Sequence, residues 1–228
     1  MGDVQTDGTT LGYVVDVPRS WIELVVAPRL DAAAIALTVA ERTERSDGTD
    51  DLRAQREVLT QLLLADALRA AGAGADYCAG FALPTEDGPV TGSLSITLVP
   101  QGDGEGLERL GLDPGRFRAV PRGEDRVSPY AETSMVEVPG AGSCPRTRGI
   151  EDAVLPDGRL QRQVFMLTAV PVPEARATFV VSASSPGITV SDALLHLFDE
   201  VTSTFRVVGP DEVVRGDLPV GTRLVTRA

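Results

Sequence analysis

The clearest alternation of hydrophobic and polar positions lies in the last third of the chain, between residues 160 and 208. Residues 163–172 (QVFMLTAVPV) and 177–182 (ATFVVS) are rich in the β-branched and aromatic side chains that are typical of strands. The proline-containing connector at 171–176 is too short for a parallel crossover, so the pattern predicts an antiparallel hairpin. Alternate residues on both faces of the first strand are largely apolar. We therefore expect this hairpin at the middle of a sheet, with helices packed above and below.

A helix is predicted directly after this hairpin, from about Ser191 to Thr202. Thr189 or Ser191 is expected to cap it, and Asp192 lies in its first turn, where the helix dipole favours a negative charge. Four apolar residues at helical spacing predict the buried face: Leu194, Leu197, Phe198 and Val201. Residues 204–208 (TFRVV) then indicate a last strand.

Earlier in the chain, six further segments have the composition and alternation of strands: 11–17, 21–26, 76–83, 92–99, 131–139 and 143–150. Residues 31–44 alternate like a strand but contain an alanine run, and we interpret them as a helix capped by Asp31. A long helix is predicted from Asp50 or Asp51 to about Ala71. Its expected apolar stripe comprises Leu52, Leu59, Leu62, Leu63 and Ala70.

The order of these segments resembles a known family. The succession of strand, PVP turn, strand ending in SSP, helix containing LFDEVTSTF and strand resembles the C-terminal half of PsbP/Mog-like α/β domains. Residues 12–21 (GYVVDVPRSW) look like the N-terminal entry of that fold, and the long helical segments are similar to those of uncharacterised bacterial proteins with it. The resemblance covers about residues 10–208. It implies an α+β fold, a mostly antiparallel central sheet covered by helices on both faces (an α/β/α sandwich), in a superfamily of accessory and partner-binding proteins.

Chain length and the distribution of patterned segments predict the domain organisation. We expect a flexible N-terminus at 1–9, a single α/β sandwich domain at 10–209, and a C-terminal tail or added edge strand at 210–228. A chain of 228 residues with 43% hydrophobic content can bury one sizeable core.

Charge and composition exclude several classes of function. The net charge of −12 disfavours nucleic acid or an anionic membrane surface as a partner, because both require a basic patch. The N-terminus lacks the basic and apolar regions of a signal peptide, and no apolar run could span a bilayer, so we expect a cytoplasmic protein. The chain contains no lysine, which excludes Schiff-base and phosphate-loop lysine chemistry.

Candidate metal and redox residues are few, and no metal or cofactor is predicted. The acidic turn at 46–51 (SDGTDD) lacks the spacing and terminal glutamate of a calcium loop and is better interpreted as a loop and helix cap. Cys78 and Cys144 lack metal-ligand spacing, and we expect free, buried thiols. Asp66 lies near the stripe of the long helix, where a carboxylate either serves as an acid in a pocket or, more commonly, pairs with an arginine.

Two hypotheses for the function follow. Residues 101–130 lack periodicity, which is typical of a binding loop, and concentrated positive charge lies in and after this loop, at Arg116, Arg118, Arg122, Arg126, Arg146 and Arg148. These arginines either form a clamp for carboxylates on another protein or neutralise neighbouring acids. The first hypothesis is a non-catalytic, protein-binding accessory module of a bacterial assembly, such as an adaptor, immunity-like or chaperone-like subunit.

The alternative is a hydrolase or small-ligand-binding enzyme that uses His196, the single histidine, with a carboxylate. By the 100° step of a helix, position 196 points away from the apolar stripe of 191–202 and toward water. A solvated helix face gives a nucleophile little support, so we expect that His196 is not catalytic and that the protein is not an enzyme.

Overall fold

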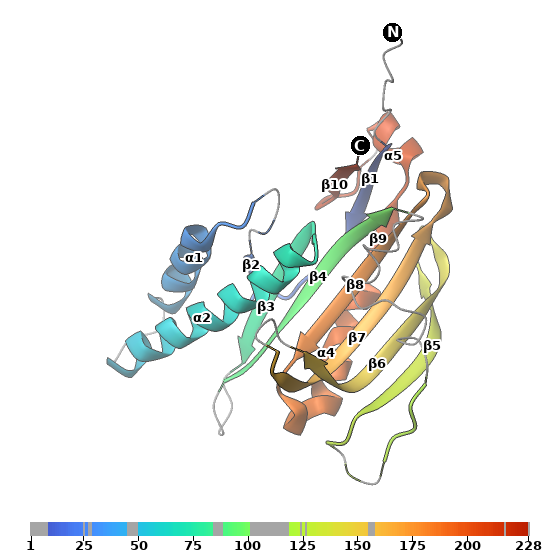
Figure 1. Cartoon of the computed structure of the whole chain (residues 1–228). Coiled ribbons are helices and arrows are strands. Elements are labelled where there is room, and N and C mark those ends of the chain that lie inside the picture. The colour runs from blue at the N-terminus through green and yellow to red at the C-terminus, as the bar shows by residue number, and fades with distance from the viewer. Residues whose placement is uncertain are drawn as a thin grey trace.

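The computed structural model describes residues 9–24, 26, 29–44, 50–83, 89–100, 119–123, 125, 127–154, 158–216 and 218–227. Its main feature is a seven-stranded sheet in which every neighbouring pair is antiparallel. The strand order is β2 (Ile22–Leu24), β3 (Tyr77–Leu83), β4 (Val90–Pro100), β8 (Ala177–Ser185), β7 (Leu160–Val172), β6 (Gly142–Val154) and β5 (Tyr130–Val138). The predicted hairpin, β7 and β8, therefore lies at the middle of this sheet, as expected (Figure 1).

Helices cover both faces of the large sheet. On one face, α2 (Asp50–Gly72) packs over β3 and β4, where a Cβ at Gly80 would overlap the side chain of Leu63. On the opposite face, α4 (Ser191–Ser203) packs against β6, β7 and β8, and its Phe198 contacts Phe81 edge-to-face at 6.2 Å. The α+β sandwich predicted from the sequence is confirmed (Figure 1).

A second, three-stranded sheet lies on the α4 side of the large one. It has the order β10 (Arg223–Arg227), β1 (Thr9–Val14) and β9 (Arg206–Val208), with β1 antiparallel to both neighbours. Tyr13 of β1 contacts Phe179 of β8 and Phe205, with ring centroids 5.4 and 5.8 Å apart. The strands predicted at 11–17 and 204–208 therefore exist but belong to this smaller sheet. The short helix α5 (Pro210–Arg215) connects β9 to the segment that leads to β10.

Two hydrophobic cores correspond to the two faces of the large sheet. The larger core holds Tyr13, Phe81, Phe179 and Phe198, all at most 1% exposed, between the sheet, α4 and the smaller sheet. The second core joins α1 (Ala32–Glu44) and α2 to β2 and β3. Trp21, which is buried, packs on Phe81 with ring centroids 4.7 Å apart and anchors the entry of the chain to the core.

The structure confirms one of the two helix caps compared here and contradicts the other. Asp31 Oδ1 accepts a hydrogen bond from the Ala34 amide at 2.9 Å, so the predicted cap of α1 is confirmed. The predicted cap of α4 is wrong. The chain enters α4 through a short 3-10 helix, η3 (Ile188–Val190), and the capping residue is Val190, which makes no side-chain capping bond. Because η3 already turns the chain into the helix, Ser191 becomes the first residue of α4 rather than its cap.

Three expectations about side chains on the helices can also be compared with the structure. The stripe predicted for α2 is wrong at Leu62, which is 39% exposed, whereas Leu63 and Ala70 are buried. Three of the four residues predicted to form the apolar stripe of α4 are buried: Leu194, Phe198 and Val201. The fourth, Leu197, is only partly buried, and Leu195 is buried instead. The side chain of Leu52 lies outside the described residues.

Candidate functional site

Three of the six arginines predicted for partner binding lie in the described part of the chain, on the α4 side of β5 and β6. Arg146 is only 5% exposed; its Nε donates to Thr168 Oγ1 at 3.0 Å and its Nη1 to Asp199 of α4. Burial lowers the pKa of Arg146, and the charge of Asp199 opposes that effect. Arg146 thus joins α4 to the sheet.

The other two described arginines are more exposed than Arg146 and also have acidic neighbours. Arg122 Nη2 donates to Asp192 Oδ1 at 3.2 Å, and its guanidinium lies 4.8 Å from the centre of the Tyr130 ring. Arg148 Nε donates to Glu132 Oε2 across the β5–β6 pair at 3.4 Å. Arg116, Arg118 and Arg126, with residues 101–118 of the predicted binding loop, lie outside the described residues.

His196 lies on the water-facing side of α4. Its side chain is 75% exposed, and Nε2 lies 3.4 Å from Glu200 Oε1 one turn later. This is the orientation predicted from the helical spacing. Within the described residues, no group of three or more His, Cys, Asp or Glu side chains could hold a metal ion.

A surface feature that the sequence pattern did not predict lies on the outside of the helical layer formed by α1 and α2. We call it the outer helical face and define it by seven exposed residues: Ala33, Ala36, Leu37, Val58, Leu62, Ala65 and Leu68. The exposed fractions of Leu37, Val58 and Leu68 are 61%, 52% and 55%. Of the charged side chains that the structure describes on α1 and α2, Glu41 and Glu57 are the exposed ones.

The outer helical face is unusual for a surface helix. A helix that packs on a sheet normally buries one apolar stripe and presents polar residues to water. α2 buries Leu63, Ala67 and Ala70 and also exposes Val58, Leu62 and Leu68, so it is apolar on two opposite sides. The sequence pattern missed this feature because Leu62 was assigned to the buried stripe. The apolar residues of α2 that fall outside that stripe, Val58, Ala65 and Leu68, were the signal that could have revealed it.

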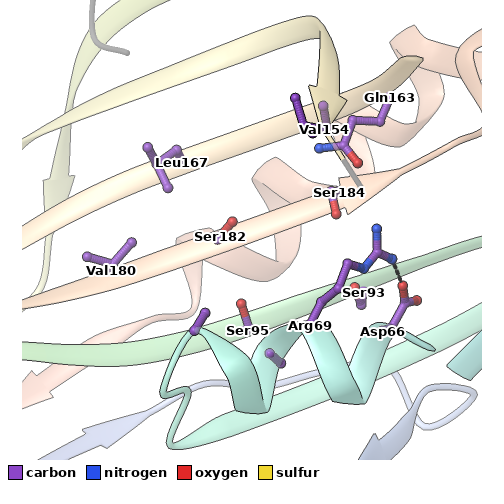
Figure 2. Close-up of a pocket in the computed structure, with 13 residues that line it drawn as sticks. Asp66, Arg69, Ser93, Ser95, Val154, Gln163, Leu167, Val180, Ser182 and Ser184 are labelled. Atoms are coloured by element: carbon purple, nitrogen blue, oxygen red, sulfur yellow. Dashed lines mark hydrogen bonds and ion pairs between the residues drawn. The ribbon is translucent and has the colours of Figure 1, made fainter. Parts of the chain in front are cut away.

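A cavity of about 190 Å³ lies between the C-terminal half of α2 and the large sheet. Figure 2 shows Arg69 of α2 extending toward β8, with Ser93 and Ser95 of β4 and Ser182 and Ser184 of β8 around it. Arg69 Nη2 donates to Asp66 Oδ1, which confirms the arginine partner expected for Asp66. Asp66 is 7% exposed, and burial lowers the pKa of Arg69.

Comparisons with known proteins do not assign the chain to a family. No family model matches the chain, and no curated protein matches it, so the resemblance to PsbP/Mog-like domains stays a prediction. Among solved structures, the chain is similar to LpqN, described as involved in cell envelope biogenesis of Mycobacterium tuberculosis, with 13% sequence identity and a TM-score of 0.42. The similarity covers 90% of this chain and 87% of LpqN. No helix among the described residues is long and apolar enough to cross a membrane.

Proposed function

We propose that this protein is a non-catalytic accessory module that binds another protein through its outer helical face. The observation that supports this proposal is the exposure of Leu37, Val58, Leu62 and Leu68 on two helices whose inward faces are already buried in the second core. Apolar side chains gathered on one exposed surface are typical of protein interaction sites, whereas single exposed ones are common anywhere.

The outer helical face resembles the centre of an interface in one respect, because the residues that define it carry no charge. Interfaces are depleted of charged residues at their centre and surrounded by polar residues. Leu62 is flanked one turn away on either side by Val58 and Ala65, while Glu57 and Gln61 are also exposed on α2. A partner that covers Leu37, Val58, Leu62 and Leu68 removes four large apolar side chains from water, each contributing up to about 1.5–3 kcal/mol before the ordering cost of association.

The charge of the chain favours a different protein over a second copy as the partner. Two copies with a net charge of −12 each repel one another as they approach, and the exposed Glu41 and Glu57 would add like charges near a self-interface of α1 and α2. We therefore expect a partner with an apolar centre and a basic margin. The arginine set predicted from the sequence stays a second proposed contact, in which Arg122 and Arg148 are the accessible described members.

The proposal is tested by capturing the partner from the host with tagged protein and comparing two matched variants. Leu62→Glu places a charge at the centre of the outer helical face and should reduce capture of the specific partner at least tenfold, because a carboxylate would be desolvated at the interface. Val214→Glu changes an 86% exposed valine of α5 in the same way and should leave capture unchanged. Equal capture by both variants, or self-association of the purified chain that Leu62→Glu abolishes, would contradict the proposal.

A further inference from the structure

The cavity between α2 and the large sheet has a floor made of hydroxyl groups. Ser93 and Ser95 of β4 lie directly opposite Ser184 and Ser182 of β8, so the four residues form two adjacent cross-strand pairs. All four line the cavity (Figure 2). On the other face of the same strands the intervening residues are apolar and buried, among them Leu94, Ile96, Val181 and Ala183.

A sheet surface that simply faces water would also favour serine, but a helix covers one side of this floor. Asp66 and Arg69 of α2 line the same cavity, and more than nine-tenths of the Asp66 side chain is buried. A buried carboxylate is costly unless it is paired, and Arg69 provides that pair. The two charges cancel, so the cavity is polar yet carries no net charge from its described lining residues.

The lining groups keep hydrogen-bonding capacity toward the cavity. In Figure 2 the guanidinium of Arg69 pairs with Asp66 through one nitrogen, Nη2. A guanidinium carries five N–H donors in all, and a carboxylate two acceptor oxygens. Gln163 of β7 donates its Nε2 to Glu151 at 2.9 Å, which leaves its amide oxygen as an acceptor. Each serine hydroxyl can both donate and accept. Leu167 and Val180 add apolar surface on one side.

We propose that this cavity is a binding site for a small uncharged molecule rich in hydroxyl groups, of the polyol or monosaccharide class. Hydroxyl groups match a lining that offers donors and acceptors together, while the carbon-bound hydrogens of such a ligand would contact Leu167 and Val180. An anion would meet the carboxylate of Asp66, and a cation would meet the guanidinium of Arg69. The cavity volume of about 190 Å³ is well above the roughly 10–15 Å³ of such space that a single water needs.

Saturation-transfer NMR on the purified full chain tests this inference with probes of similar size and different charge. D-glucose and myo-inositol are the uncharged probes, D-gluconate is the anionic probe and D-glucosamine the cationic one. An uncharged probe should bind at least tenfold more tightly than either charged probe. The double variant Ser95→Ala/Ser182→Ala should weaken its binding about tenfold, because two hydrogen bonds are lost.

Ser134→Ala removes an exposed serine of β5 in the same sheet and serves as the matched control, with no expected change in binding. The melting temperature of each variant is measured in parallel, and Ser182→Val, which narrows the cavity without exposing new surface, replaces the double variant if that variant unfolds. Absence of saturation transfer to both uncharged probes, tighter binding of a charged probe, or equal binding by the wild type and the cavity variants would overturn the inference. The cavity variants change no residue of the outer helical face. A negative result for ligand binding therefore does not contradict the proposed protein binding, and the reverse also holds.

Discussion

At the residue scale, Gly149 is a position where the fold tolerates no side chain. It lies in β6 directly opposite Ala131 of β5, and a Cβ there would overlap the backbone oxygen of Tyr130. Backbone cannot rotate away as a flexible side chain can, so the two strands would have to separate. Gly149→Ala should therefore lower the free energy of unfolding by about 2 kcal/mol or more.

Gly209 is the matched control for Gly149. Its φ of −70° suits any residue, and a Cβ there has no neighbour within 4 Å. Gly209 caps the short helix α5, so Gly209→Ala should lower the free energy of unfolding by less than about 1 kcal/mol, through the capping preference alone. Denaturant unfolding of the two variants measures both values, and equal effects would show that β5 and β6 are not as closely paired at Gly149 as described here.

The two cysteines provide a second prediction at the residue scale. Cys78 and Cys144 are free and buried, and burial raises the pKa of the Cys78 thiol to about 12. Because the thiolate is the reactive form, a maleimide should label Cys78 in the folded protein at pH 8 far more slowly than in denaturant. Both thiols should react in denaturant without prior reduction, as counted by mass spectrometry. Fast labelling of folded Cys78, or a purified protein two hydrogens lighter, would contradict this prediction.

The raised pKa of Cys78 also has a consequence for stability. The folded state favours the protonated thiol, so this group's contribution to stability is complete below pH 9, near its ordinary pKa of 9.0. The contribution is lost as pH rises from 9 toward 12. In that range the thiol ionises in the unfolded chain but not yet in the folded one, and this ionisation stabilises the unfolded chain.

At the scale of secondary-structure elements, the contact between α4 and β6 depends on a buried guanidinium. Asp199→Ala would leave Arg146, 5% exposed, with Thr168 as its remaining described partner. This variant should lower the free energy of unfolding by about 1–3 kcal/mol, because a buried charge loses its counterion. Asp192→Ala removes the partner of the more exposed Arg122 and should cost less than about 1 kcal/mol. Thermal unfolding compares the two, and a larger effect at Asp192 would contradict the structural role of Arg146.

The elements differ in how far the sequence could predict them. β7 and β8 were predictable because local composition and a short turn determine their pairing, and the apolar faces of β7 indicated its central place. The sequence could not predict that β1 and β9 belong to a separate sheet. Their pairing depends on contacts between residues nearly 200 positions apart, such as Tyr13 with Val207. β10 pairs with β1 across a similar separation.

The candidate sites could also be predicted only where they depend on residues close together in the sequence. Asp66 and its pairing with an arginine could be predicted from helical spacing alone. The hydroxyl floor of the cavity could not, since Ser93 and Ser184 become neighbours only through the register of β4 and β8. The outer helical face was missed for another reason: helical periodicity shows which residues share a face, but it does not show which of two apolar faces of α2 contacts the sheet.

At the scale of the whole molecule, the large sheet separates two sides with different roles. On the α4 side, the larger core and the smaller sheet provide most of the buried aromatic side chains, and Arg122, Arg146 and Arg148 tie that side together through ion pairs. On the other side, α1 and α2 form a second core, roof the cavity and expose the outer helical face (Figure 1). Binding to another protein on this side would leave the larger core undisturbed.

The most direct test of protein binding through the outer helical face is site-specific photocrosslinking in the host. A photoreactive amino acid placed at Leu62 or Leu68 should form one crosslinked product with a protein other than this chain. The same amino acid at Val214 or Val220, which are 86% and 98% exposed, should form none. Crosslinks at Val214 or Val220 with none at Leu62 and Leu68, or a product that contains two copies of this chain, would contradict the proposed function.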